Sequence, residues 1–166
     1  FESWLEARPA NKKMEVGTFR VNGAWAVSNG SHQSGKSASS PIQLMVRISP
    51  AVRDLRCDPT QLQVALMALI QNSAESLLLA GGTAIDLRVS TQAGQTCFEI
   101  TDNGAGISRG VANHMFDPFF SGREAGRGLG FGLSKAWRIA QLHEGSLDFD
   151  QDFLAGARFI FRIPGY

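Results

Sequence analysis

The order of the predicted secondary-structure elements constrains the fold of this chain more than any other feature of its sequence. Alternating apolar residues predict strands over residues 84–90 and 96–101, joined by a turn around residues 92–95. A second hairpin is predicted within residues 145–164. Its apolar positions are Leu147, Phe149, Phe159, Phe161 and Ile163. Strands that follow one another without an intervening helix indicate an antiparallel or mixed sheet.

A further strand, over residues 42–48, precedes the clearest helix in the sequence. The strand has apolar residues at every second position. Asp58 can cap the N-terminus of the helix, Pro59 suits its first position, and Gly81 and Gly82 end it. The helix carries one stripe at helical spacing, made of Leu62, Leu66, Leu69, Ser73 and Leu77.

A second helix is predicted over residues 133–143. Leu133, Ala136 and Ala140 are expected to face inward, and Trp137 is a further candidate. The full order is strand, helix, two strands, glycine-rich loop, helix and two strands. This order predicts an α+β domain: a two-layer α/β sandwich with a mixed, mostly antiparallel sheet and helices on one face.

Residues 41–166 are predicted to form this domain, and residues 1–40 an N-terminal extension. The extension contains a candidate hairpin that turns at Asn22-Gly23 and a Ser/Gly-rich linker over residues 27–40. Because the chain starts with Phe1 rather than Met, we expect it to be a segment of a longer protein.

The composition argues against several classes of function. A formal net charge of +1 gives no broad electrostatic reason to bind nucleic acid or an anionic membrane. No apolar run is long enough to span a bilayer. Cys57 and Cys97 are too few for a disulfide scaffold, so we expect reduced cysteines in a cytoplasmic protein. The two could still pair if the fold brought them together.

The stretch TDNGAGIS, residues 101–108, places a carboxylate and two glycines directly after a predicted strand. Asp102 can accept a hydrogen bond from an exocyclic amine and so recognise adenine. Gly104 and Gly106 let the backbone approach a ligand closely. The alternative is an ordinary Asx-turn at the end of a strand.

Asn72 is the second candidate, because it shares one helix face with Ala68 and Glu75. Its amide oxygen can coordinate a magnesium ion. The alternative is a partly exposed asparagine on the flank of a helix.

The third candidate is the segment GRGLGFGLS, residues 126–134, which leads directly into the second helix. Free N–H groups at a helix start, together with the helix dipole, favour an anion. The segment is not a Walker A loop, since no Gly-Lys-Ser/Thr follows. It also does not follow a strand in the way that a Rossmann loop does. The alternative is a flexible loop.

Taken together, these segments resemble a known family. LMALIQNSAESL, DNGAGI, FDPFFSGREAGRGLGFGLS and GARFIFRIP are similar, in order and spacing, to the N, G1, F, G2 and G3 boxes of sensor histidine kinases. These boxes belong to the ATP-binding (Bergerat) domain that such kinases share with DNA gyrase, the ninety-kilodalton heat-shock chaperone and MutL. The resemblance extends from Ile42 to Pro164.

The resemblance implies ATP and Mg²⁺ as ligands and a role for each matching residue. Asn72 would hold the magnesium ion, Asp102 would bind the adenine amine, and Ile107 would pack near the base. Residues 108–125 would form a mobile lid over the nucleotide, with an aromatic segment made of Phe116, Phe119 and Phe120. The residues expected at the base or the phosphates are Gly104, Gly106, Arg123, Gly128, Leu129, Gly130, Gly132 and Leu133.

Three departures from the family pattern bear on activity. Ala68 stands where histidine kinases often have Asn and where the ATPases have a Glu base, so autonomous ATP hydrolysis is not expected. Glu75 is acidic at a position that is often basic. Ala157 replaces a threonine of the third box, which removes one polar contact worth about 1 kcal/mol.

No histidine of this chain resembles a phosphoacceptor on a dimerisation helix. His32 lies in a Ser/Gly-rich loop, His114 in the lid segment, and His143 at the end of the second helix. The resemblance therefore implies two partners, a histidine-containing dimerisation domain upstream or on another protein, and a response regulator.

The leading hypothesis is the catalytic domain of a two-component sensor histidine kinase, which transfers the γ-phosphate of Mg·ATP to that histidine. Two alternatives remain open. One is a degenerate nucleotide-binding interaction module without kinase activity. The other is a serine kinase of the anti-sigma type, which shares the boxes.

Overall fold

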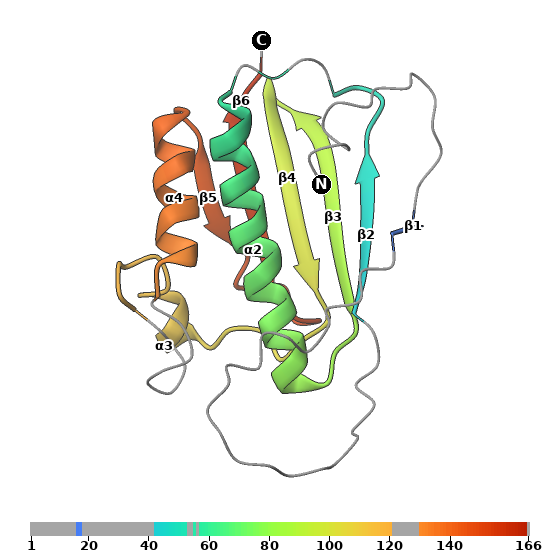
Figure 1. Cartoon of the computed structure of the whole chain (residues 1–166), viewed down its shortest axis with the longest axis vertical. Coiled ribbons are helices and arrows are strands. Elements are labelled where there is room, and N and C mark those ends of the chain that lie inside the picture. The colour runs from blue at the N-terminus through green and yellow to red at the C-terminus, as the bar shows by residue number, and fades with distance from the viewer. Residues whose placement is uncertain (1–15, 18–41, 53–54, 56, 121–129, 166) are drawn as a thin grey trace.

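A six-stranded sheet forms one layer of the computed structural model (Figure 1). The structure describes residues 16–17, 42–52, 55, 57–120 and 130–165. The strands are β1 (Val16–Gly17), β2 (Gln43–Ile48), β3 (Ala84–Gln92), β4 (Gln95–Asp102), β5 (Ser146–Phe149) and β6 (Arg158–Pro164), in the spatial order β1-β2-β3-β4-β6-β5. β2 and β3 are parallel, and the other neighbours are antiparallel. The predicted mixed, mostly antiparallel sheet is confirmed.

Helices α2 (Pro59–Ala80) and α4 (Gly132–Leu142) cover one face of this sheet (Figure 1). Asp58 caps the N-terminus of α2, as predicted. Its Oδ1 accepts hydrogen bonds from the N–H groups of Thr60 at 2.8 Å and Gln61 at 3.1 Å. Gly81 ends the helix in the left-handed conformation, at φ +78°. All five residues of the predicted stripe are buried: Leu62, Leu66, Leu69, Ser73 and Leu77.

By length and composition alone, α2 is apolar enough to cross a membrane, with a mean hydropathy of 1.3 over its most apolar window. The expectation that no apolar run reaches this length is therefore wrong. The reason is that the polar residues of α2 other than Glu75 are uncharged. In the structure, the leucines of the buried stripe belong to the domain core, and α2 contacts both the sheet and α4.

The inward face of α4 differs in part from the prediction. Ala136 and Ala140 are fully buried, and Leu133 packs against the core. Trp137 is 40% exposed, whereas Ile139 is 7% exposed and takes the inward position. The helix lies against both α2 and the sheet, so the two contacts together decide which side is buried.

Two loops also show features that were not predicted. The turn between β3 and β4 is only Ala93-Gly94, with φ of 49° and 75°, so both strands extend further than expected. The irregular stretch after β4 contains a short helix, α3 (Arg109–Ala112), capped by Ser108.

His143 joins the end of α4 to the start of α2. Its Nδ1 lies 2.9 Å from the carbonyl oxygen of Ile139, and its Nε2 lies 3.1 Å from the backbone nitrogen of Asp58. A neutral imidazole that carries its proton on Nδ1 satisfies both contacts. His143 therefore has a structural role in this arrangement.

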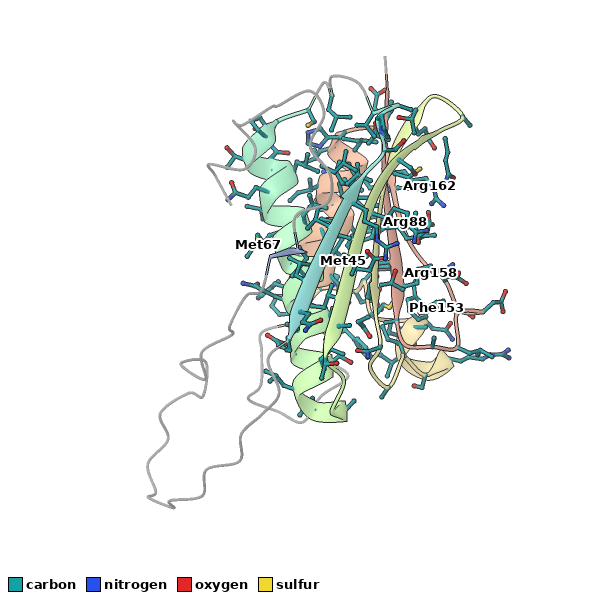
Figure 2. The ribbon with its side chains drawn as sticks, turned by 90° about the vertical axis from the view of Figure 1, so that its right-hand side faces the viewer. Met45, Met67, Arg88, Phe153, Arg158 and Arg162 are labelled. Atoms are coloured by element: carbon teal, nitrogen blue, oxygen red, sulfur yellow. The ribbon has the colours of Figure 1, made fainter. Side chains whose placement is uncertain are left out.

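The other face of the sheet carries alternating charges. Arg47 pairs with Asp86 at 2.9 Å, and Arg158 pairs with Asp150 at 3.2 Å while its guanidinium stacks 4.1 Å from the ring centre of Phe153. Figure 2 shows Arg88, Arg158 and Arg162 on this side. Partly exposed pairs of this kind contribute little to stability. The two-layer arrangement therefore places the core, and any buried ligand site, on the helical face.

Of residues 1–40, only β1 lies among the described residues. The candidate hairpin at residues 22–23, the linker over residues 27–40 and His32 lie outside them. The domain boundary at residue 41 stays a prediction.

Candidate functional site

Asp102, the last residue of β4, is a buried carboxylate with an exposed fraction of 4%. Its Oδ1 accepts from the backbone N–H of Gly104 at 3.0 Å and of Ala157 at 3.2 Å. Its Oδ2 is buried and has no hydrogen-bond partner in the described part of the chain. An unpaired carboxylate oxygen in a buried position is costly, which makes it a strong acceptor for a ligand that donates.

Glycines bring two backbone segments together beside this carboxylate. Gly106 has φ +74°, and a Cβ built on it would lie 3.0 Å from the carbonyl oxygen of Gly156. A Cβ on Gly156, whose φ is +148°, would overlap the carbonyl oxygen of Asp102. A Cβ on Gly104 would lie 3.0 Å from Asp102 Oδ1. The close approach of the loop after β4 to the start of β6 therefore depends on residues without side chains.

Ile107 and Ser108 follow this loop. Ile107 is half-buried and packs against the core, next to the loop that carries Gly106. Ser108 Oγ accepts from the N–H of Val111 and so begins α3. The predicted base-side residues Asp102, Gly104, Gly106 and Ile107 thus lie in one continuous loop at the end of β4.

Asn72 lies half-buried on α2, directly before the fully buried Ser73. One turn earlier, Ala68 meets the first residue of α4, because a Cβ built on Gly132 would lie 3.9 Å from Ala68 Cβ. The fold therefore brings Asn72 within about one helical turn of the point where α4 begins. Ala68 offers no polar atom at this contact.

The start of α4 has the features of an anion site. Its N-cap residue, Phe131, makes no side-chain capping bond. Ser134 Oγ donates back to the Phe131 carbonyl at 3.2 Å, so it does not serve the first N–H groups of the helix. Those groups and the helix dipole favour a negative ligand. Gly130 precedes them at φ +69°, and a Cβ there would lie 2.6 Å from the carbonyl oxygen of Phe120.

The aromatic segment before the glycine-rich loop divides into packed and exposed rings. Phe116 and Phe120 pack against the core, so core packing is their local role. Phe119 is 76% exposed at φ +67°, and its ring centre lies 4.7 Å from that of Phe131. His114 pairs with Asp117 at 3.0 Å.

Three predicted site residues, Arg123, Gly128 and Leu129, lie outside the described residues, as does the segment around them, residues 121–129. Their expected phosphate contacts stay predictions. Gly132 and Leu133 are placed as the first two residues of α4.

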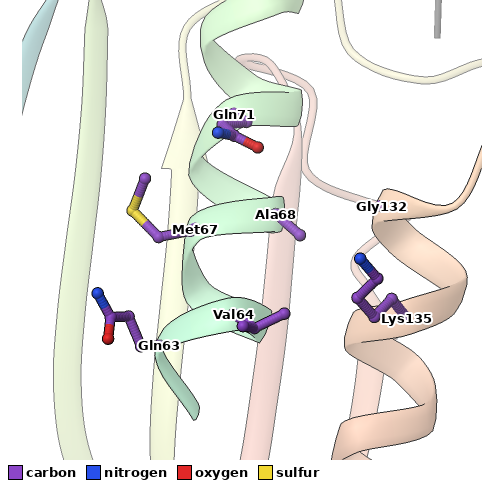
Figure 3. Close-up of a pocket in the computed structure, with 7 residues that line it drawn as sticks. All are labelled: Gln63, Val64, Met67, Ala68, Gln71, Gly132 and Lys135. Atoms are coloured by element: carbon purple, nitrogen blue, oxygen red, sulfur yellow. The ribbon is translucent and has the colours of Figure 1, made fainter. Parts of the chain in front are cut away.

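A hollow of about 420 Å³ lies between α2 and α4 (Figure 3). Ala68 and Val64 point from α2 toward α4, and Lys135 lies on the side of α4 that faces α2. The hollow adjoins Gly132 at the helix start rather than Asp102. It is therefore associated with the expected phosphate end of the site and not with the base end.

Sequence reasoning missed two contributors to the site. Gly156 permits the approach of β6 to Asp102, and the backbone N–H of Ala157 fixes the carboxylate. The third box includes this segment, but its sequence pattern concerns the hydroxyl that Ala157 lacks and not the backbone N–H. Only the β4–β6 pairing makes its backbone relevant.

Comparisons with known proteins agree with this geometry. The family model described as histidine kinase-, DNA gyrase B-, and HSP90-like ATPase matches residues 57–166. The signal transduction histidine-protein kinase AfsQ2 of Streptomyces coelicolor is 34% identical over 112 residues, which are 66% of this chain and 20% of AfsQ2. The sensory histidine kinase/phosphatase NtrB of Escherichia coli O157:H7 is 31% identical over 118 residues, 65% of this chain and 33% of NtrB. The chain thus spans a third or less of these relatives.

A solved structure, the catalytic domain of histidine kinase ThkA in a nucleotide-free form, superposes with a TM-score of 0.58 and 27% identity. The match covers 72% of this chain and 76% of that domain. Fold, site and relatives lead to the same conclusion. The chain belongs to the histidine kinase-, DNA gyrase B- and HSP90-like ATPase family, and within it resembles the ATP-binding catalytic domain of sensor histidine kinases.

Proposed function

We propose that this chain binds Mg·ATP and transfers its γ-phosphate to a histidine of a dimerisation domain, as the catalytic part of a two-component sensor kinase. The observation that carries the proposal is the carboxylate of Asp102. Backbone N–H groups fix one oxygen, and the other is buried with no hydrogen-bond partner among the residues that the structure describes. The exocyclic amine of adenine supplies the missing donor.

The residues of the phosphate end suit an anionic, metal-bearing ligand. Asn72 would hold Mg²⁺ through its amide oxygen. No group of three or more His, Cys, Asp or Glu side chains among the described residues could hold a metal ion. Mg²⁺ is usually bound by one or two protein oxygens together with substrate phosphates and water, so a single amide oxygen from the protein is a sufficient contribution. When bound, the ion supplies positive charge that neutralises the phosphate oxygens.

Transfer then depends on positioning and electrostatics. The N–H groups of Gly132 and Leu133, at the start of α4, would orient the phosphate chain, and Arg123 would add a positive charge. Ala68 has no group that could act as a base for water, so little ATP should be lost through hydrolysis. A histidine acceptor needs no such base, because the imidazole is itself a nucleophile.

The acceptor is proposed to lie outside this chain. The two histidines in the described residues are engaged elsewhere: His114 pairs with Asp117, and His143 contacts two backbone groups. A response regulator would then receive the phosphoryl group. The free cysteines Cys57 and Cys97 support a reducing, cytoplasmic location.

Neither alternative function is favoured. The loss of a threonine hydroxyl at Ala157 was the argument for a degenerate module, yet the backbone N–H of that residue still fixes Asp102. AfsQ2 and NtrB are both named histidine kinases, not serine kinases. Acid stability of the phosphorylated acceptor separates the kinase types, since phosphohistidine is acid-labile and phosphoserine is not.

The direct test is calorimetric titration of ATP and ADP, with and without Mg²⁺, into this chain and into Asp102→Ala. We expect micromolar to millimolar affinity that Mg²⁺ strengthens for ATP and that the variant loses. A folded chain that binds neither nucleotide would contradict the proposal. Ser90→Ala, on the charged face of β3, is the matched control and should bind normally.

A further inference from the structure

Ser73 is fully buried, and its hydroxyl has no hydrogen-bond partner in the part of the chain that the structure describes. It belongs to the core-facing stripe of α2, where the neighbouring members are Leu69 and Leu77. A leucine or an alanine would satisfy the packing of such a stripe. A buried hydroxyl without a partner costs free energy instead, so its presence points to a water or a ligand that completes it.

The turn of α2 that carries Ser73 lies against the end of β4. A Cβ built on Gly104 would lie 3.0 Å from both Ser76 Oγ and Asp102 Oδ1, and 3.5 Å from Leu77 Cδ2. Ser73 lies one turn before Ser76 and Leu77, on the side facing the sheet. The free hydroxyl of Ser73 and the free Oδ2 of Asp102 therefore belong to the same end of the core.

These two atoms have complementary hydrogen-bonding abilities. A carboxylate oxygen only accepts, whereas a hydroxyl can donate. The edge of adenine presents a donor, the exocyclic amine, next to an acceptor, ring nitrogen N1. We propose that Ser73 is a second adenine-recognition residue, whose hydroxyl donates toward N1, directly or through one water, while Asp102 Oδ2 accepts from the amine. This inference rests on the proposed function of the site.

If Ser73 recognises adenine, Ser73→Ala should lower the affinity for ATP without lowering the stability of the free protein. A residue that serves only in packing would not show this combination. Ser73→Ala removes a buried hydroxyl that is unpaired among the described residues, so the nucleotide-free variant should unfold at the same temperature or a higher one. Binding of ATP should nevertheless weaken by about three- to tenfold, the equivalent of one hydrogen bond. Stability and affinity would therefore change in opposite directions.

The experiment compares ATP with 1-deaza-ATP, in which a C–H group replaces N1. Calorimetry on the unmodified chain, Ser73→Ala, the near-isosteric Ser73→Cys and the control Ser90→Ala gives the affinities, and thermal unfolding without nucleotide gives the stabilities. We expect Ser73→Ala and Ser73→Cys to lose affinity for ATP but not for 1-deaza-ATP. Ser90→Ala should resemble the unmodified chain with both nucleotides.

Three results would overturn the inference. If the unmodified chain binds ATP and Ser73→Ala binds it equally well, Ser73 has no part in recognition and the proposed function stands. If Ser73→Ala loses affinity for ATP and 1-deaza-ATP equally, Ser73 does not recognise N1, and the proposed function again stands. If the unmodified chain binds no nucleotide, the proposed function fails, and the inference fails with it.

Discussion

Replacing Asp102 by asparagine provides a sharp test of the base end of the site, because the change keeps the shape of the side chain and alters one atom. Oδ1 accepts from two backbone N–H groups, at 3.0 and 3.2 Å. An asparagine keeps these bonds only if its carbonyl oxygen takes the Oδ1 position. Its NH₂ group is then placed where Oδ2 was, facing the exocyclic amine of adenine.

The expected loss of affinity follows from this reversal. A hydrogen bond to a charged acceptor contributes about 1.5–3 kcal/mol, and two facing donors leave one of them unpaired. We expect ATP to bind roughly 10- to 100-fold more weakly to Asp102→Asn. GTP, whose O6 accepts from an NH₂ group, should lose less affinity or gain some.

The assay is calorimetric titration of ATP and GTP into both proteins, accompanied by thermal unfolding. The melting temperature should change little, since both backbone contacts persist. Asp102→Ala is the comparison variant, because it removes these contacts as well and should destabilise the loop. A folded Asp102→Asn protein that binds ATP as tightly as the unmodified chain would refute the argument.

Three further changes test other parts of the fold. Gly156→Ala should destabilise the domain by about 2–3 kcal/mol in urea unfolding, because its Cβ overlaps the Asp102 carbonyl oxygen, and an unchanged midpoint would contradict that contact. His143→Ala should cost about 1–2 kcal/mol in the same assay, since it breaks the link to the Asp58 N–H, whereas the exposed His114→Ala should cost little. Burial, and secondarily the charge of Asp58, raises the pKa of the Cys57 thiol, so alkylation of this residue should accelerate only at higher pH than for a free cysteine. A rate profile for Cys57 that coincides with that of free cysteine would contradict this expectation.

Much of the fold followed from short-range rules. Asp58, Pro59 and Gly81 set the ends of α2 by hydrogen bonding and backbone conformation within a few residues, and all were predicted correctly. The period of the apolar residues identified the buried face of α2 and the strands of both hairpins. The short helix α3 was not predicted, because four residues are too few for a helical period to be recognised.

The inward face of α4 was not determined locally. Trp137 and Ile139 are both apolar and lie on opposite flanks of the stripe formed by Leu133, Ala136 and Ala140, so periodicity could not choose between them. Which of the two side chains is buried depends on where α2 and the sheet pack against α4. Packing against two partners buries the smaller, β-branched side chain and leaves the indole partly exposed.

The candidate site also combines features set by neighbouring residues with features set by tertiary packing. The sequence alone determined that a carboxylate and glycines follow a buried strand, and that a glycine-rich segment leads into a helix, because these are properties of neighbouring residues. Only the tertiary structure decided that Ala157 fixes one oxygen of Asp102 and that the Ser73 hydroxyl meets no hydrogen-bond partner within the described ranges. The physical reason is that the pairing of a buried polar atom depends on groups far away in the chain, which meet only when the sheet and the helices pack together.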